Sequence, residues 1–134
     1  YQITYNVSGF DSITYAGFDI LFDHETYSGL SLVSADTINW DGDTDVWQPD
    51  NVLGEEEDGT LDALAQVISD SLTGSFTVTF IYTGEALPGV QDVQYFDTDW
   101  NVTATGQTSA VPVPGSFIVL FSGIAGLCAL KRKF

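Results

Sequence analysis

The positive charges of this chain are confined to its C-terminal end, and this partition limits what the rest of the chain can be. All three Lys and Arg residues fall within residues 131–133, whereas all 19 Asp and Glu residues lie between Asp11 and Asp99. Residues 1–130 therefore hold nothing that could neutralise a phosphate, which excludes nucleic-acid binding by this region. We also expect its carboxylates to find no ion pair and to be satisfied by water, backbone N–H groups or dissolved cations.

The C-terminal region contains a candidate membrane anchor. No charged residue occurs from Val111 to Leu130, and a helix of this length, at ~1.5 Å per residue, would cover the ~30 Å hydrocarbon core of a bilayer. Pro is tolerated in the first turn of a helix but not in its interior. We therefore predict a domain at 1–108, a Pro-containing linker at 109–114 and a transmembrane helix at 115–131.

Small residues recur four apart within this predicted helix. Ser122 and Gly126 form one pair, and Ala125 and Ala129 form another. Such spacing allows two membrane helices to approach closely, although small residues are also common in membrane helices generally. These four residues are the candidates for packing against the helices of a larger membrane complex.

The basic end at 131–134 predicts the orientation of the chain. Cations directly after an apolar span stay in the cytoplasm because their translocation is costly. Lys131, Arg132 and Lys133 would then anchor the cytoplasmic C-terminus, with the acidic domain and the N-terminus extracytoplasmic. The chain contains no Met, so we expect that a segment preceding Tyr1 was removed, either a cleaved signal peptide or a part trimmed from the chain.

The domain at 1–108 is expected to be mainly β. Apolar and polar residues alternate in several short runs, as they do in strands with one buried face. The run from Phe76 to Tyr82 is also rich in β-branched and aromatic residues. Turn signals about every 8–12 residues predict an antiparallel β-sandwich. The predicted core and sheet-face residues are Phe18, Ile20, Phe22, Phe76, Val78, Phe80 and Tyr82.

Residues 60–72 fit two kinds of secondary structure. The apolar positions from Leu61 to Leu72 follow the helical template, with Thr60 as a cap. The segments on both sides, however, read as strands. We favour a strand, or a strand followed by a turn.

The tail resembles a known sorting signal. The motif Val111, Pro112, Val113 and Pro114 precedes a Gly-bearing apolar run and then the basic end, over about 24 of the 134 residues. This arrangement is similar to a PEP-CTERM tail, although the namesake motif reads Pro-Glu-Pro. The resemblance implies export through a Gram-negative inner membrane, transient anchoring there, and processing by an exosortase, a membrane cysteine transpeptidase.

The domain has a weaker resemblance to extracellular β-sandwich domains, some of them cohesin-like, that often precede such tails. Residues 16–23, 30–35 and 76–80 carry this resemblance. It implies a structural or adhesive role, and it transfers no catalytic residue.

The sequence offers little catalytic chemistry. His24 is the only imidazole, and with Asp23 and Glu25 beside it we expect a solvated turn residue. One His and one Cys, the latter in the apolar tail, do not suggest a zinc site. We therefore predict that the protein is not an enzyme.

An acidic loop is a candidate calcium site. Asp41, Asp43 and Asp45 stand at alternate positions, and Ca²⁺ prefers six to eight oxygen ligands. The EF-hand template fails, because its sixth and twelfth positions would be Val46 and Val52. A calcium site of another kind and a solvated acidic loop both remain open, and no other cofactor is expected.

The tryptophans Trp40, Trp47 and Trp100 lie near acidic segments. We expect them in the sandwich core, whereas exposure would make them contacts for a ligand or partner.

Three functions fit these observations. The first is a structural or adhesive single-pass cell-envelope protein that reaches the surface or matrix after PEP-CTERM-type sorting. The second is an accessory subunit of a membrane complex, with its helix packed against partner subunits and its β domain covering their extracytoplasmic face. The third, a Ca²⁺- or glycan-binding surface module, is compatible with either.

Overall fold

The computed structural model describes residues 1–50 and 56–109, and in these ranges the chain forms strands and no helix. The prediction of a mainly β domain is confirmed. The strands are β1 (Gln2–Phe10), β2 (Gly17–Phe22), β3 (Tyr27–Ala35), β4 (Asp45–Trp47), β5 (Gly59–Leu64), β6 (Leu72–Tyr82), β7 (Asp92–Phe96) and β8 (Val102–Gln107).

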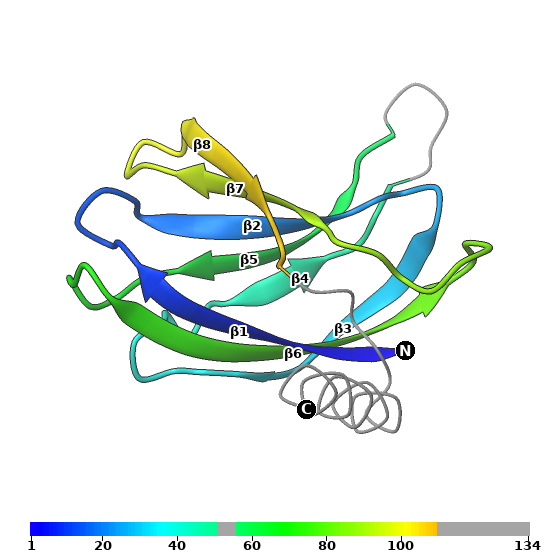
Figure 1. Ribbon diagram of the computed structural model, residues 1–134, viewed down its shortest axis with the longest axis horizontal. Coiled ribbons are helices and arrows are strands. Elements are labelled where there is room, and N and C mark those ends of the chain that lie inside the picture. The colour runs from blue at the N-terminus through cyan, green and yellow to red at the C-terminus, as the bar shows by residue number, and fades with distance from the viewer. Residues whose placement is uncertain (51–55, 110–134) are drawn as a thin grey trace, which may run out of the picture.

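The strands form two antiparallel sheets that face each other (Figure 1). One sheet has the order β1-β6-β3, and the other has the order β4-β5-β2-β7-β8. Successive strands run in opposite directions, so the connections after β1, β3, β5 and β7 gather at one end of the sandwich, on the left in Figure 1. We call this end the four-loop end.

The hydrophobic core lies between the two sheets and contains the residues predicted for it. Phe18 of β2 packs edge-on against Phe76 of β6, with ring centroids 5.7 Å apart. Of the predicted set, all are buried except Tyr82, which is partly buried and packs against the core. Burial of large aromatic side chains from both sheets supplies the main driving force for this fold.

Residues 60–72 form a strand followed by a turn, which was the favoured prediction. β5 ends at Leu64, and β6 begins at Leu72. β5 lies between β4 and β2, so its side chains alternate between the core and the outside. Leu61 and Ala63 are fully buried, whereas Asp62 between them points away from the core. Strand pairing thus outweighs the helical spacing of the apolar residues.

The three tryptophans do not share one environment. Trp40 is fully buried, and its indole Nε1 donates a hydrogen bond to the Thr73 carbonyl at 3.0 Å. Trp47 and Trp100 are 65% and 63% exposed, so the prediction that they belong to the core is wrong. Alternation along β4 turns Val46 inward and Trp47 outward, while Trp100 sits in a turn with a positive φ of 64°.

Residues 51–55 and 110–134 are not among those described. The predicted sorting motif, transmembrane helix, helix-packing residues and basic end lie outside the described residues and stay predictions. Within 1–50 and 56–109, the structure has no helix long and apolar enough to cross a membrane.

Candidate functional site

Three aspartates form a continuous row across one half of the five-stranded sheet, from the edge strand β4 to the central strand β2. Asp19 of β2 lies directly opposite Asp62 of β5, and Asp62 lies directly opposite Asp45 of β4. Their neighbours along each strand point into the core, so these side chains share the outer face of the sheet. We call Asp45, Asp62 and Asp19 the carboxyl row. Beyond Asp19, the row continues with the uncharged Gln94 and Thr105.

Asp19 and Asp62 of the carboxyl row share an unfavourable environment. Burial, together with the negative charge of Asp62, raises the pKa of Asp19 to about 7, and burial also raises the pKa of Asp62. One oxygen of each carboxyl, Oδ1, is buried without a hydrogen-bond partner. Like charges directly opposite each other destabilise a sheet. One proton shared by the two carboxyls would relieve this repulsion near neutral pH.

Exposed aromatic side chains stand on both sides of the carboxyl row. Trp47 follows Asp45 by two residues on β4 and so shares its outer face. On the other side, the Phe96 ring covers Gly17, where an added Cβ would lie 2.6 Å from the ring. Trp100 stacks on Phe96 with ring centroids 5.1 Å apart. The carboxyl row thus lies between two indoles that face solvent.

The three aspartates of the predicted calcium site serve separate roles. Asp41 Oδ1 accepts a hydrogen bond from the Asp43 backbone N–H at 2.9 Å, and Asp45 Oδ1 accepts one from the Val46 backbone N–H at 2.8 Å. Among the described residues, these three are not a group whose possible ligand atoms lie within 4.8 Å of one another. Asp45 belongs to the carboxyl row instead, and calcium binding by this loop stays a prediction.

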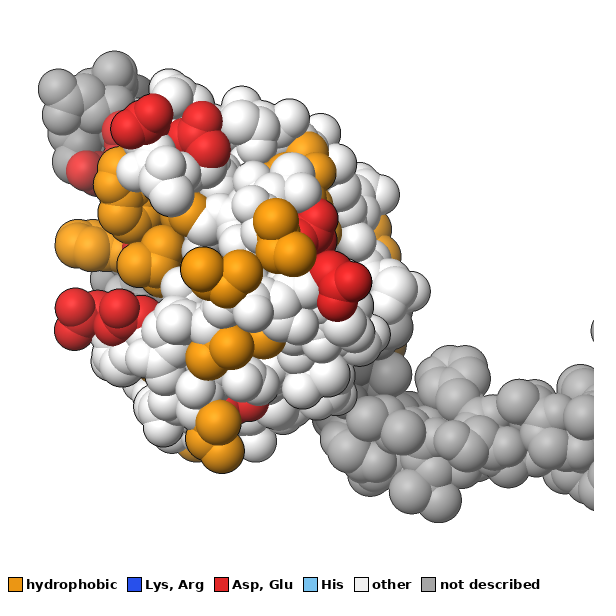
Figure 2. Space-filling model, turned by 90° about the vertical axis from the view of Figure 1, so that its left-hand side faces the viewer, with side chains coloured by type: hydrophobic (Ala, Val, Ile, Leu, Met, Phe, Trp, Pro, Cys, Tyr) orange, Lys and Arg blue, Asp and Glu red, His pale blue; other side chains and the backbone are white. Residues whose placement is uncertain are grey.

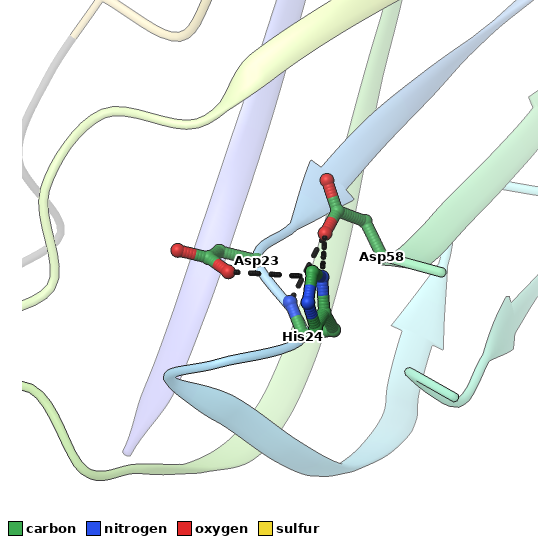
Figure 3. A group of neighbouring side chains, drawn as sticks. All are labelled: Asp23, His24 and Asp58. Atoms are coloured by element: carbon green, nitrogen blue, oxygen red, sulfur yellow. Dashed lines mark hydrogen bonds and ion pairs between the residues drawn. The ribbon is translucent and has the colours of Figure 1, made fainter. Parts of the chain in front are cut away.

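A second charged group lies beside the end of β2 and the start of β5 (Figure 3). His24 Nδ1 is 2.9 Å from Asp58 Oδ1 and 4.0 Å from Asp23 Oδ1, and His24 Nε2 is 3.8 Å from Glu56 Oε2. The hydrogen bond to Asp58 and the surrounding negative charges raise the pKa of His24. His24 lies in a turn, as predicted, and it is partly exposed. The prediction that the carboxylates of this domain find no ion pair is wrong, because a protonated His24 pairs with these three carboxylates.

The His24 group could hold a divalent metal ion. Ligand atoms of Asp23, His24 and Asp58 all lie within 4.8 Å of one another. Hydrogen bonds from the His24 ring and from its backbone N–H to Asp58 Oδ1 already account for this arrangement, however. The group is therefore explained as an ion-pair cluster that ties the turn after β2 to the start of β5.

The four-loop end presents exposed aliphatic side chains. Figure 2 shows this end with scattered hydrophobic side chains, a few carboxylates and no Lys or Arg. Hydrogen bonds brace the loops: Ser12 Oγ donates to the Val67 carbonyl at 2.6 Å, and Gln66 Nε2 donates to the Ile38 carbonyl at 2.9 Å. We call the exposed residues Ile13, Ile38, Val67 and Ile68 the apolar loop residues.

Comparisons with profiles of known families, with curated proteins and with solved structures found no match for this chain. Because one fold can host many functions, only the chemistry of particular surfaces can indicate what this chain does. Of these, the outer face of the five-stranded sheet is the candidate functional site, because it combines unpaired buried carboxyl oxygens with exposed indoles.

Proposed function

We propose that this chain is a non-enzymatic, single-pass protein of the bacterial cell envelope. Its exported acidic β-sandwich would be a structural or adhesive domain at the surface or in the matrix, after sorting of the PEP-CTERM type. The observation that carries the proposal is the outer face of the five-stranded sheet. Three opposed carboxyls destabilise the sheet there, and the exposed Trp47 has no evident role in the core. Such local conflicts concentrate at functional sites, which supports a surface made for contact.

The direction of the chain supports the same reading. β8 begins after the four-loop end and runs away from it, ending at Gln107. The predicted anchor follows in sequence. An anchor on that side would leave the four-loop end pointing away from the membrane and the sheet face open beside it, as a displayed domain requires.

The proposed topology predicts a clear protease result. Protease added to intact spheroplasts should digest the β domain while leaving a tag placed after Phe134 protected, because the basic end is expected in the cytoplasm. The tag should be digested only after the membrane is permeabilised. A β domain that resists protease until permeabilisation would contradict the proposal.

A second candidate function is that of an accessory subunit in a membrane complex. The apolar loop residues favour it, because exposed aliphatic side chains on braced loops suit a preformed contact with another protein. Mass spectrometry of the native protein separates the two functions. Loss of everything after about residue 114 supports sorting, whereas an intact tail with stoichiometric partners supports a subunit.

A further inference from the structure

We propose that the outer face of the five-stranded sheet binds an Arg- or Lys-bearing segment of another protein, whose cationic group sits on the carboxyl row between Trp47 and Trp100. This inference rests on the proposed function, because it names the partner chemistry of an adhesive domain. It also names the residues that make the contact, and it predicts that the contact is lost at low pH.

The negative charge of the carboxyl row is not balanced by any Lys or Arg of the domain. Asp19 and Asp62 each keep a buried Oδ1 without a partner, and residues 1–130 contain no Lys or Arg. A guanidinium carries five N–H donors in a rigid fork and can bond two carboxylates at once. Both Oδ1 atoms are enclosed, so an Arg side chain would approach the partly exposed remainder of the two carboxyls, and its positive charge would offset the repulsion across β2 and β5.

The two exposed indoles favour an organic cation over a metal ion. Trp47 and Trp100 flank the carboxyl row, and an indole face attracts a guanidinium or ammonium group. The indoles can also cover the alkyl stem of an Arg or Lys side chain. Calcium would need six to eight oxygen ligands and would gain nothing from tryptophan. The combination of carboxyls and indoles thus fits a cationic side chain better than a free ion.

Charge also argues against a second copy of this domain as the partner. The formal net charge of the whole chain is −16, and its cations are confined to residues 131–133. Two acidic domains would repel each other. The basic end of a second copy could supply Arg132, but the proposed topology places that end across the membrane. A foreign basic segment is therefore the occupant to test.

Binding at the carboxyl row should be lost as the pH falls, because a proton and a cation compete for the same pair. Asp45 faces the pair from β4, while β7 and β8 contribute the uncharged Gln94 and Thr105. The only other charged group on these strands near the row is Asp92, which accepts a hydrogen bond from Gln107 Nε2. We expect tight binding at pH 8 and weak binding at pH 5.

The test uses the full chain in a non-ionic detergent and two capped tripeptides. One is Ac-Leu-Arg-Leu-NH₂, and the other replaces Arg with citrulline, which has the same shape without the charge. Calorimetry at pH 8 should show the Arg peptide binding about tenfold or more tightly than the citrulline peptide. Asp19→Asn and Asp62→Asn should each remove most of this preference. Asp70→Asn, which deletes an exposed charge elsewhere, should leave it unchanged.

Several outcomes would overturn the inference. Equal affinity for the two peptides would show that the carboxyl row does not recognise the positive charge. An equal loss of the Arg preference in Asp19→Asn and Asp70→Asn would show the same. Binding of a neutral oligosaccharide that depends on Trp47, without an Arg preference, would assign the face to a glycan. Self-association abolished by Arg132→Gln would assign it to a second copy. Peptide binding is measured on purified chain, so its failure is separate from a failure of the protease test.

Discussion

Replacing Trp40 with Ala is expected to lower the free energy of unfolding by about 3–5 kcal/mol, because this removes a large side chain from a filled core. Trp40 is fully buried between the sheets, with its ring centroid 5.0 Å from that of Phe10 and 5.2 Å from that of Phe18. The substitution also leaves the Thr73 carbonyl without its indole donor. Urea unfolding of the full chain, followed by circular dichroism, measures the effect.

Trp47→Ala is the matched control for this experiment. It deletes the same side chain from an exposed position, so the free energy of unfolding should change by no more than about 0.5 kcal/mol. Similar losses in the two variants would contradict the assignment of Trp40 to the core and of Trp47 to the outer face.

Asp19→Asn should stabilise the domain at pH 8, by about 1–3 kcal/mol after allowance for partial solvent exposure. The Asn amide can donate to Asp62 and so replaces the shared proton permanently. Because the pKa of Asp19 rises from 3.8 to about 7 on folding, the folded state binds the proton more tightly. The corresponding stability is complete below about pH 4 and is lost as the pH rises to about 7. The variant should therefore gain little at pH 4 and most at pH 8.

The control for this prediction is again Asp70→Asn, because it reports the general relief of repulsion in an acidic domain. His24 must be treated separately, since its raised pKa makes its own contribution fall with rising pH in the same direction. Measuring Asp19→Asn in a His24→Gln background isolates the carboxyl pair. A stability gain that is the same at pH 4 and pH 8 would show that Asp19 and Asp62 do not share a proton.

Alternating patterns and turn signals were enough to predict the β fold and its core. Phe18, Ile20 and Phe22 stand at every second position, and this alternation indicates a strand with one buried face. The strand at the start of 60–72 could also be predicted, because the strands on both sides supplied the context. These features depend on residues that are close together in the sequence, so they could be predicted without a structure.

The candidate site could not be predicted in the same way. The carboxyl row depends on the registers of β4, β5 and β2, and register is set by pairing between segments that are distant in sequence. Asp19 and Asp62 are 43 residues apart in numbering, and His24 and Asp58 are 34 apart. An Asp in an outward position of a strand looks ordinary until its neighbours are known. One available signal was the Asp residue inside each of the two apolar strands β2 and β5.

The outward position of Trp47 was also missed, for a related reason. Large aromatic residues in a sandwich are usually buried, and this expectation held for Trp40. β4 has only three residues, too few for an alternating pattern to show which face is buried. The exposed indole became informative only when it was found beside the carboxyl row.

The most direct test of the account follows the three indole N–H signals by NMR while the Arg tripeptide is added at pH 8. Trp47 and Trp100 report on the outer face of the five-stranded sheet, and the buried Trp40 is an internal control in the same spectrum. The account predicts that the Trp47 and Trp100 signals shift with the peptide while Trp40 stays in place, and that the shifts vanish at pH 5 and with the citrulline peptide. Indole signals of Trp47 and Trp100 that do not move as the Arg peptide saturates the chain would contradict it.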